Sequence, residues 1–148
     1  WGQVSHWKNS ITVFKHTINV TDKKYPNLAI IHNNLGIALF ADRKNEEAIS
    51  HFKMAIKLKP THTKAYYNLG IALFADRKNE EAISHYKMAI KLNPNFTDAH
   101  YNLGVILLQK GEIKEAVYHF RKTLRLRPGF IRARDHLELA LLQLQELE

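Results

Sequence analysis

The chain has 148 residues, 45% of them hydrophobic and 24% charged, which is ordinary for one folded domain with a sizeable core. It contains no cysteine, which excludes disulfide bonds and metal sites that need thiolate ligands, and its net charge of +8 favours acidic partners or surfaces without specifying one. No apolar run of about 18 residues occurs, so we expect no transmembrane span in this sequence.

The first predicted element is a helix that includes residues 9–18. Ser10 and Phe14 stand in it where later, similar segments of the chain have Ala and Phe. We therefore interpret residues 1–28 as a capping helix and a linker. Because the chain begins at Trp1 rather than at a methionine, we also expect it to be a fragment of a longer protein.

An internal repeat follows this helix. Residues 34–58 recur at 68–92 with one change, Phe52 to Tyr86, and a diverged third copy begins at Asn102. The offset is 34 residues both times, a period that is typical of stacked helix pairs. The three units have the boundaries 29–62, 63–96 and 97–130.

Each unit is predicted to form two amphipathic helices. The apolar residues of the second unit recur at helical spacing on either side of the polar turn 76–79, and Pro94 ends the unit because it cannot continue a helix. One glycine lies in each first helix, and we expect it to face an alanine of the second helix so that the two helices approach closely. The predicted pairs are Gly36 with Ala48, Gly70 with Ala82, and Gly104 with Ala116.

The last predicted element is a capping helix in residues 131–148. It begins like a fourth first helix, but Glu138 occupies the glycine position. Because no second helix follows, we expect its leucine edge to remain uncovered, at Leu137, Leu141 and Leu144. We expect Leu139, Leu142 and Gln143 to lie on the groove side of the same helix.

The Leu-Gly…Leu…Ala…Tyr…Ala…Pro pattern of residues 69–94 resembles the tetratricopeptide-repeat family, and all three copies share it. This resemblance implies an all-α fold, a right-handed α-solenoid of helix hairpins with three full repeats and one flanking helix at each end. It also implies a non-enzymatic scaffold that binds a protein or peptide and needs no cofactor. Residues 7–21 further resemble the entry helix of bacterial membrane glycosyltransferase-like repeat proteins, which would place the repeats outside the cytoplasm.

In this family the second, fifth, sixth, ninth and twelfth positions of each repeat face a concave groove, so the resemblance implies a peptide-binding site there. The predicted site residues are Asn33, Asn34, Ile37, Phe40, Lys64, Tyr67, Asn68, Ile71, Phe74, Asp98, Tyr101, Asn102, Val105 and Leu108, with Ile30 beside them.

Two features of this set suggest binding, and each has a structural alternative. Asn34, Asn68 and Asn102 recur at the repeat period and resemble the asparagine ladder of the O-linked N-acetylglucosamine transferase repeat domain, which grips a peptide main chain. The alternative is that these amides only satisfy local hydrogen bonds. The apolar residues of the set could form a partner surface, or some of them could belong to the core.

Other residues suggest other functions less strongly. His51, His85 and His119 recur every 34 residues, but repeats packed about 8–10 Å apart cannot share one metal ion, so we interpret them as solvent-exposed and expect no metal site. The basic stretch 121–134 favours an acidic protein or lipid surface over nucleic acid. Self-association by end-to-end stacking remains the main alternative to a peptide-binding module.

Overall fold

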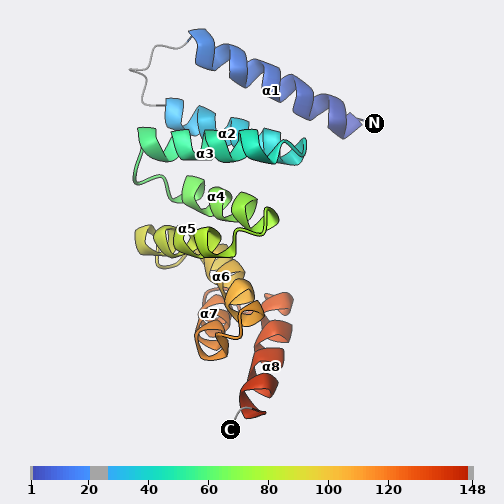
Figure 1. Ribbon diagram of the computed structural model, residues 1–148, viewed down its shortest axis with the longest axis vertical. Helices are drawn as coiled ribbons and strands as arrows, with labels where there is room; N and C mark the ends of the chain where they lie inside the picture. Colours follow the sequence, from blue (N-terminus) through green and yellow to red (C-terminus); the bar gives the residue numbers. More distant parts are fainter. Residues whose placement is uncertain (1, 21–26, 147–148) are drawn as a thin grey trace. The chain divides into compact units, whose positions relative to one another are not determined.

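The computed structural model describes residues 2–20 and 27–146, and this part of the chain forms eight α-helices and no strand (Figure 1). The all-α fold and the number of helices predicted from the sequence are confirmed. The predicted link between the capping helix and the first repeat falls largely on residues 21–26, outside the described residues. The helices are α1 (Gly2–Val20), α2 (Leu28–Ala41), α3 (Asn45–Leu58), α4 (Thr63–Ala75), α5 (Asn79–Leu92), α6 (Thr97–Gln109), α7 (Ile113–Leu126) and α8 (Ile131–Gln145).

The helices group into two compact units whose boundary lies inside α5. In unit 1, Trp1–His85, α2 packs against α1, α3 and α4, and α3 also packs against α4. In unit 2, Tyr86–Glu148, α6, α7 and α8 pack against one another. Each unit therefore brings two first helices side by side, α2 with α4 and α6 with α8.

The periodic small and apolar residues form the interior of both units. In unit 1 the leucines of α2, Leu35 and Leu39, are fully buried with Phe52 of α3. In unit 2, Leu103 and Leu107 of α6 and Phe120 of α7 are fully buried in the same way. The predicted amphipathic faces are thus correct, and burial of these side chains is the main term that stabilises each hairpin.

The glycines of the first helices permit close packing, and the atoms nearest to Gly36 and Gly104 belong to an aromatic ring rather than to the predicted alanine. A Cβ atom on Gly36 would lie 2.6 Å from the ring of Phe52, and one on Gly104 would lie 2.8 Å from the ring of Phe120. Both rings are fully buried and have little freedom to move. Each glycine therefore makes room for an aromatic ring.

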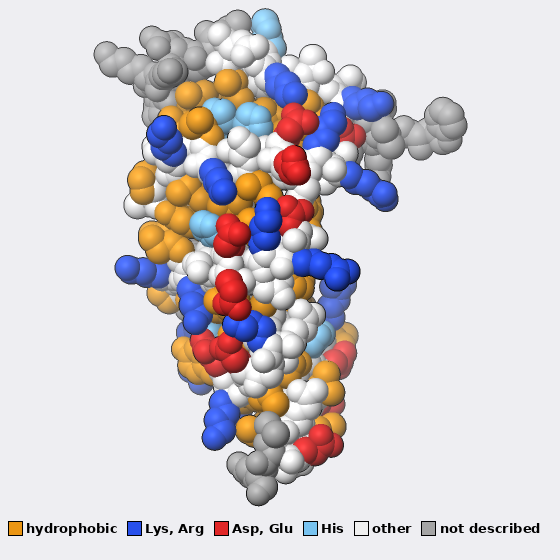
Figure 2. Space-filling view, in the orientation of Figure 1, with side chains coloured by type: hydrophobic (Ala, Val, Ile, Leu, Met, Phe, Trp, Pro, Cys, Tyr) orange, Lys and Arg blue, Asp and Glu red, His pale blue; other side chains and the backbone are white. Residues whose placement is uncertain are grey.

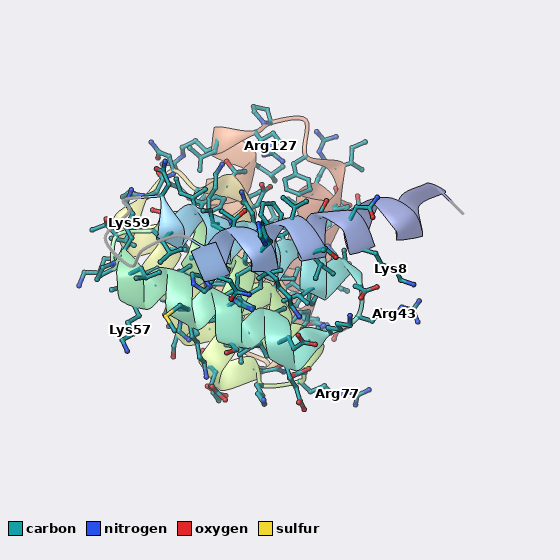
Figure 3. All side chains as sticks on the ribbon, turned by 90° about the horizontal axis from the view of Figure 1, so that it is seen from above. Lys8, Arg43, Lys57, Lys59, Arg77 and Arg127 are labelled. Carbon is teal, nitrogen blue, oxygen red and sulfur yellow. The ribbon has the colours of Figure 1, made fainter. Side chains whose placement is uncertain are left out.

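The turn between the two helices of a repeat has the same backbone design in all three copies. Arg43, Arg77 and Gly111 take positive φ angles of 62°, 59° and 78°. The next residue donates its N–H to the carbonyl five residues earlier, as from Lys44 to Leu39 over 2.9 Å, which is the Schellman motif that ends a helix. In unit 1 these turns lie at one edge, where Figure 3 shows Arg43 and Arg77, and Lys57 and Lys59 lie at the opposite edge.

Candidate functional site

The predicted site residues of α2 and α4 meet in unit 1 through a row of three amides. Asn68 donates from Nδ2 to Oδ1 of Asn33 over 2.9 Å, and Asn33 donates from Nδ2 to Oδ1 of Asn34 over 3.4 Å. The Asn33 side chain is only 4% exposed, whereas Asn34 and Asn68 are half-buried. Asn33 therefore lies under the surface and holds the two more accessible amides in place.

Apolar side chains accompany this amide row. Ile37 is 39% exposed, and Phe40, Tyr67, Ile71 and Phe74 are half-buried. None of the five belongs to the fully buried core, so the alternative that Ile37 and Ile71 are ordinary core residues does not hold for this unit. Lys64, the predicted cation of the set, is exposed at the start of α4.

In unit 2, three α6 residues of the predicted site contact the side chains of other residues. Tyr101 packs against the Phe130 ring at 4.7 Å between centroids and meets the His136 ring edge-on at 5.7 Å, and burial raises the pKa of its hydroxyl. Asn102 donates from Nδ2 to the Tyr86 hydroxyl over 3.5 Å. The carboxylate of Asp98 pairs with Arg127 at 3.1 Å.

Val105 and Leu108 of α6 are half-buried, and the neighbouring helix α8 extends the apolar surface. Leu139 and Leu142, at the ninth and twelfth positions of this incomplete fourth repeat, are 47% and 60% exposed. Leu137, Leu141 and Leu144, which form the predicted uncovered edge, are half-buried and less exposed than these two leucines. The predicted peptide-binding residues end at Leu108, although the sequence also predicts Leu139 and Leu142 on the groove side of α8.

The interpretation of the repeated histidines as solvent-exposed was wrong. Each contacts an aromatic residue of the first helix in its own repeat. His51 lies with its Nδ1 2.8 Å from Nδ1 of His32, and the His85 ring lies 6.0 Å from the ring of Tyr66. Histidine side chains accordingly appear among hydrophobic ones on the face shown in Figure 2.

The third pair is the most buried, with His100 only 2% exposed and His119 only 6% exposed. The Nδ1 atoms of the two rings are 2.9 Å apart, and Nε2 of His100 lies 3.0 Å from the carbonyl oxygen of Pro94. Because a carbonyl can only accept, His100 carries its proton on Nε2, and neutral His119 must donate from Nδ1 to the bare Nδ1 of His100. The sequence signal for these pairs is a constant separation of 19 residues between the partners.

Burial lowers the pKa values of six histidines, which are His32, His51, His62, His85, His100 and His119. The effect is largest for His119, where burial, the charge of a protonated His100 and Lys87 together lower the pKa to about 4. At neutral pH the paired rings are therefore uncharged and act as hydrogen-bonded packing groups.

Among the described side chains, those of residues 8–19 and 27–146, no three His, Asp or Glu side chains gather closely enough to hold a metal ion. None of the described helices combines the length and the hydrophobicity that crossing a membrane requires. The described first helices present amides and apolar side chains that are partly exposed, at Asn34, Asn68, Ile37 and Ile71 among others.

Comparison with known proteins agrees with this architecture. No curated protein sequence matches the chain. The crystal structure of MamA superposes with a TM-score of 0.83 at 30% sequence identity, covering 93% of this chain and 78% of that one. The first TPR of Spaghetti (RPAP3), bound to the HSP90 peptide SRMEEVD, has a TM-score of 0.77 at 24% identity, covering 79% of this chain and 93% of that one, a likeness of fold alone. The tetratricopeptide-repeat family model matches residues 33–95 and 67–129, and the chain belongs to the tetratricopeptide-repeat family.

Proposed function

We propose that the chain is a protein-interaction module that binds an extended or helical peptide segment along its first helices. The observation that carries this proposal is the polarised row of amides in unit 1, in which Asn33 is buried while Asn34 and Asn68 remain accessible. A buried amide costs free energy unless its polar atoms are hydrogen-bonded, and both contacts of Asn33 meet that requirement.

The two accessible amides offer different chemistry to a ligand. Asn68 uses its Nδ2 as a donor to Asn33, so its Oδ1 is left to accept a hydrogen bond. Asn34 uses its Oδ1 as an acceptor, so its Nδ2 is left to donate one. A peptide main chain carries one N–H and one C=O per residue, and therefore matches such a donor–acceptor pair whatever its side chains are.

Apolar residues beside the amides would supply affinity and side-chain selectivity. Ile37, Phe40, Ile71 and Phe74 keep part of their surface exposed, and covering apolar area contributes about 25 cal/mol per Å² before the costs of association. In unit 2, the ring of Tyr101, a residue type that is enriched in interface hot spots, already packs at a tilt against Phe130.

The Spaghetti (RPAP3) domain supports peptide binding by this fold, since its structure holds the HSP90 peptide SRMEEVD. Our proposal differs in the ligand chemistry. The predicted site offers one well-placed exposed cation, Lys64, and Asp98 is paired with Arg127, so we do not expect recognition to depend on a terminal carboxylate. The expected ligand is an internal segment with apolar side chains.

The test is a selection of peptides from a random displayed library on the whole chain, followed by calorimetry with variants. Asn34→Ala with Asn68→Ala should weaken binding by about 1–3 kcal/mol in total, because each amide–backbone hydrogen bond nets about 0.5–1.5 kcal/mol. Ser50→Ala, an exposed change on α3, is the matched control and should leave the affinity unchanged. Loss of folding without a specific loss of affinity would favour the structural role of the amides.

The exposed leucines of α8 favour a second candidate, weak self-association. Leu139 and Leu142 present apolar surface on a helix that has no following hairpin within the described residues. Charge repulsion between copies with a net charge of +8 opposes contact, but salt screens exposed charges beyond about 8–10 Å while apolar contact persists. Association should therefore strengthen as salt rises.

Light scattering across protein and salt concentrations distinguishes the two candidates. Leu139→Lys with Leu142→Lys should abolish any dimer while leaving the amides of unit 1 intact. A chain that stays monomeric at about millimolar concentration and high salt would leave the peptide-binding module as the only candidate.

A further inference from the structure

The outward face of α7 carries a row of four exposed residues, Lys114, Tyr118, Arg121 and Arg125, which we name the α7 stripe. Their spacing of four, three and four residues places them in one line along the helix. The line spans about 16 Å, from a rise of 1.5 Å per residue. Tyr118 is 60% exposed, so most of its surface is open to a partner.

The helix beneath the stripe is firmly anchored. The opposite face of α7 buries Ile113, Ala116, Val117, Phe120 and Thr123 in unit 2. The Tyr118 ring meets the buried His119 ring edge-on at 5.1 Å between centroids. The four side chains thus project from a fixed backbone, so a ligand would not have to order the helix in order to bind.

The positive charge of the stripe is not compensated within the described part of the chain. Lys114, Arg121 and Arg125 make no ion pair there, whereas three acids of the same unit are paired with other cations. Those pairs are Glu115 with Lys87 at 3.2 Å, Glu112 with Lys110 at 2.8 Å and Asp98 with Arg127 at 3.1 Å.

The other two repeats show that the fold does not require this stripe. The corresponding residues are Glu46, Ser50, Lys53 and Lys57 in α3, and Glu80, Ser84, Lys87 and Lys91 in α5. Where α3 and α5 each have one acid and two lysines, α7 has three cations, and where they have a serine, α7 has a tyrosine. The buried positions keep their small or aromatic character, as at Phe52, Tyr86 and Phe120. The third repeat thus differs on its outward face in a way that packing does not explain.

We propose that the α7 stripe is a docking surface for an acidic segment of a partner protein. Arginine guanidinium groups bind carboxylates in a bidentate manner, so Arg121 and Arg125 suit side chains of Asp or Glu one helical turn apart. Tyr118 supplies an apolar ring and a hydroxyl in the middle of the row, where interface hot spots concentrate. This surface lies on a second helix and is independent of the peptide site proposed on the first helices.

The composition of the stripe favours a protein over the other polyanions. A membrane-binding helix needs a broad apolar face to insert, and the stripe has one aromatic residue in four. Single-stranded nucleic acid needs several stacking side chains along a cationic groove, and Tyr118 stands alone on a convex helix face. Three cations beside one aromatic anchor fit a short acidic peptide.

The test uses the whole chain and a fluorescent oligoglutamate peptide at about physiological salt, with fluorescence anisotropy as the readout. Arg121→Glu with Arg125→Glu should raise the dissociation constant at least about tenfold, equivalent to 1.4 kcal/mol. Lys53→Glu with Lys57→Glu changes the net charge equally at the corresponding positions of α3 and should have little effect. Equal losses in the two variants would show that only the overall charge matters and would overturn the proposal.

Two further comparisons keep the proposal falsifiable. Tyr118→Ser introduces the residue that α3 and α5 carry, leaves the charge unchanged, and should weaken peptide binding severalfold. No change in that variant would overturn the role of the stripe. Tighter binding to oligothymidylate or to phosphatidylserine vesicles at the same salt would overturn the choice of partner, as would a dimer that the Arg121 and Arg125 changes abolish, since the occupant would then be a second copy of this chain.

Discussion

The interiors of the first and third repeats pack in the same way, although the sequences of these repeats differ. In unit 1, Gly36 accommodates the ring of Phe52, and His32 pairs with His51. In unit 2, Gly104 accommodates Phe120, and His100 pairs with His119, with nearly equal distances in each case. The repeats differ instead at the turn and on the outward face. The comparison teaches that the interior of the hairpin tolerates little variation, so differences on its surface can reflect recognition.

The largest expected difference between the two repeats is their response to acid. When folding lowers the pKa of a histidine, the unfolded state binds the proton more readily than the folded state. The free energy of unfolding is therefore unaffected above the unfolded pKa of about 6.5 and decreases as the pH falls towards the folded pKa. For His119, with a folded pKa of about 4, the loss should reach about 3 kcal/mol at pH 4, at about 1.4 kcal/mol per pH unit. Denaturant unfolding of the parent and of His119→Phe should differ in slope between about pH 6.5 and pH 4.

Nuclear magnetic resonance can follow each ring separately and so locates the effect. His119 should titrate near pH 4, and the half-buried His51 should titrate at a higher pH although its pKa is also lowered by burial and by Lys15. Protonation of His119 would add a proton on Nε2, which lies 4.0 Å from Oε1 of Glu115. A His119 that titrates near 6.5 would contradict the buried, uncharged pair.

A somewhat smaller effect tests the glycine–phenylalanine contact in both repeats. Gly36→Leu and Gly104→Leu should each destabilise the chain by at least about 2 kcal/mol, because the new side chain must displace a buried ring. Gly129→Leu is the matched control, since a Cβ atom there would meet nothing within 4 Å. Thermal melts compare the three variants. Equal melting temperatures for Gly36→Leu and the parent would show that the two helices can move apart without a loss of stability.

Much of this fold could be predicted from the sequence because the 34-residue period fixes which residues are equivalent. Periodicity identified the helices, the glycines and the turns, but it does not say which side chain fills a space. For that reason Gly36 was assigned to the small residue Ala48, when the Phe52 ring occupies the gap. Likewise the histidines looked exposed, because their partners lie 19 residues away on another helix.

The candidate site was predictable to the same extent. The repeat numbering placed Asn34 and Asn68 on one surface, but it could not distinguish them from the buried Asn33 beneath. That distinction depends on how closely α2 approaches α4, and the approach is set by packing rather than by either helix alone. The α7 stripe needed both kinds of information: the repeat alignment for its unusual composition, and the structure for its exposure and unpaired charge.

The smallest expected effect concerns the turn, where the first two repeats have arginine and the third has glycine. Arg43 and Arg77 take a left-handed backbone conformation that costs a residue with a Cβ atom on the order of 1 kcal/mol or more, whereas Gly111 adopts it freely. Because glycine also gains entropy in the unfolded chain, Arg77→Gly should stabilise by only about 0.5–1 kcal/mol, and Gly111→Arg should destabilise by a similar amount. Chemical unfolding of both variants measures the two changes. If Arg77→Gly lowers stability, then contacts of the arginine side chain outweigh the backbone strain, and the turns of the first and third repeats are not equivalent in energy.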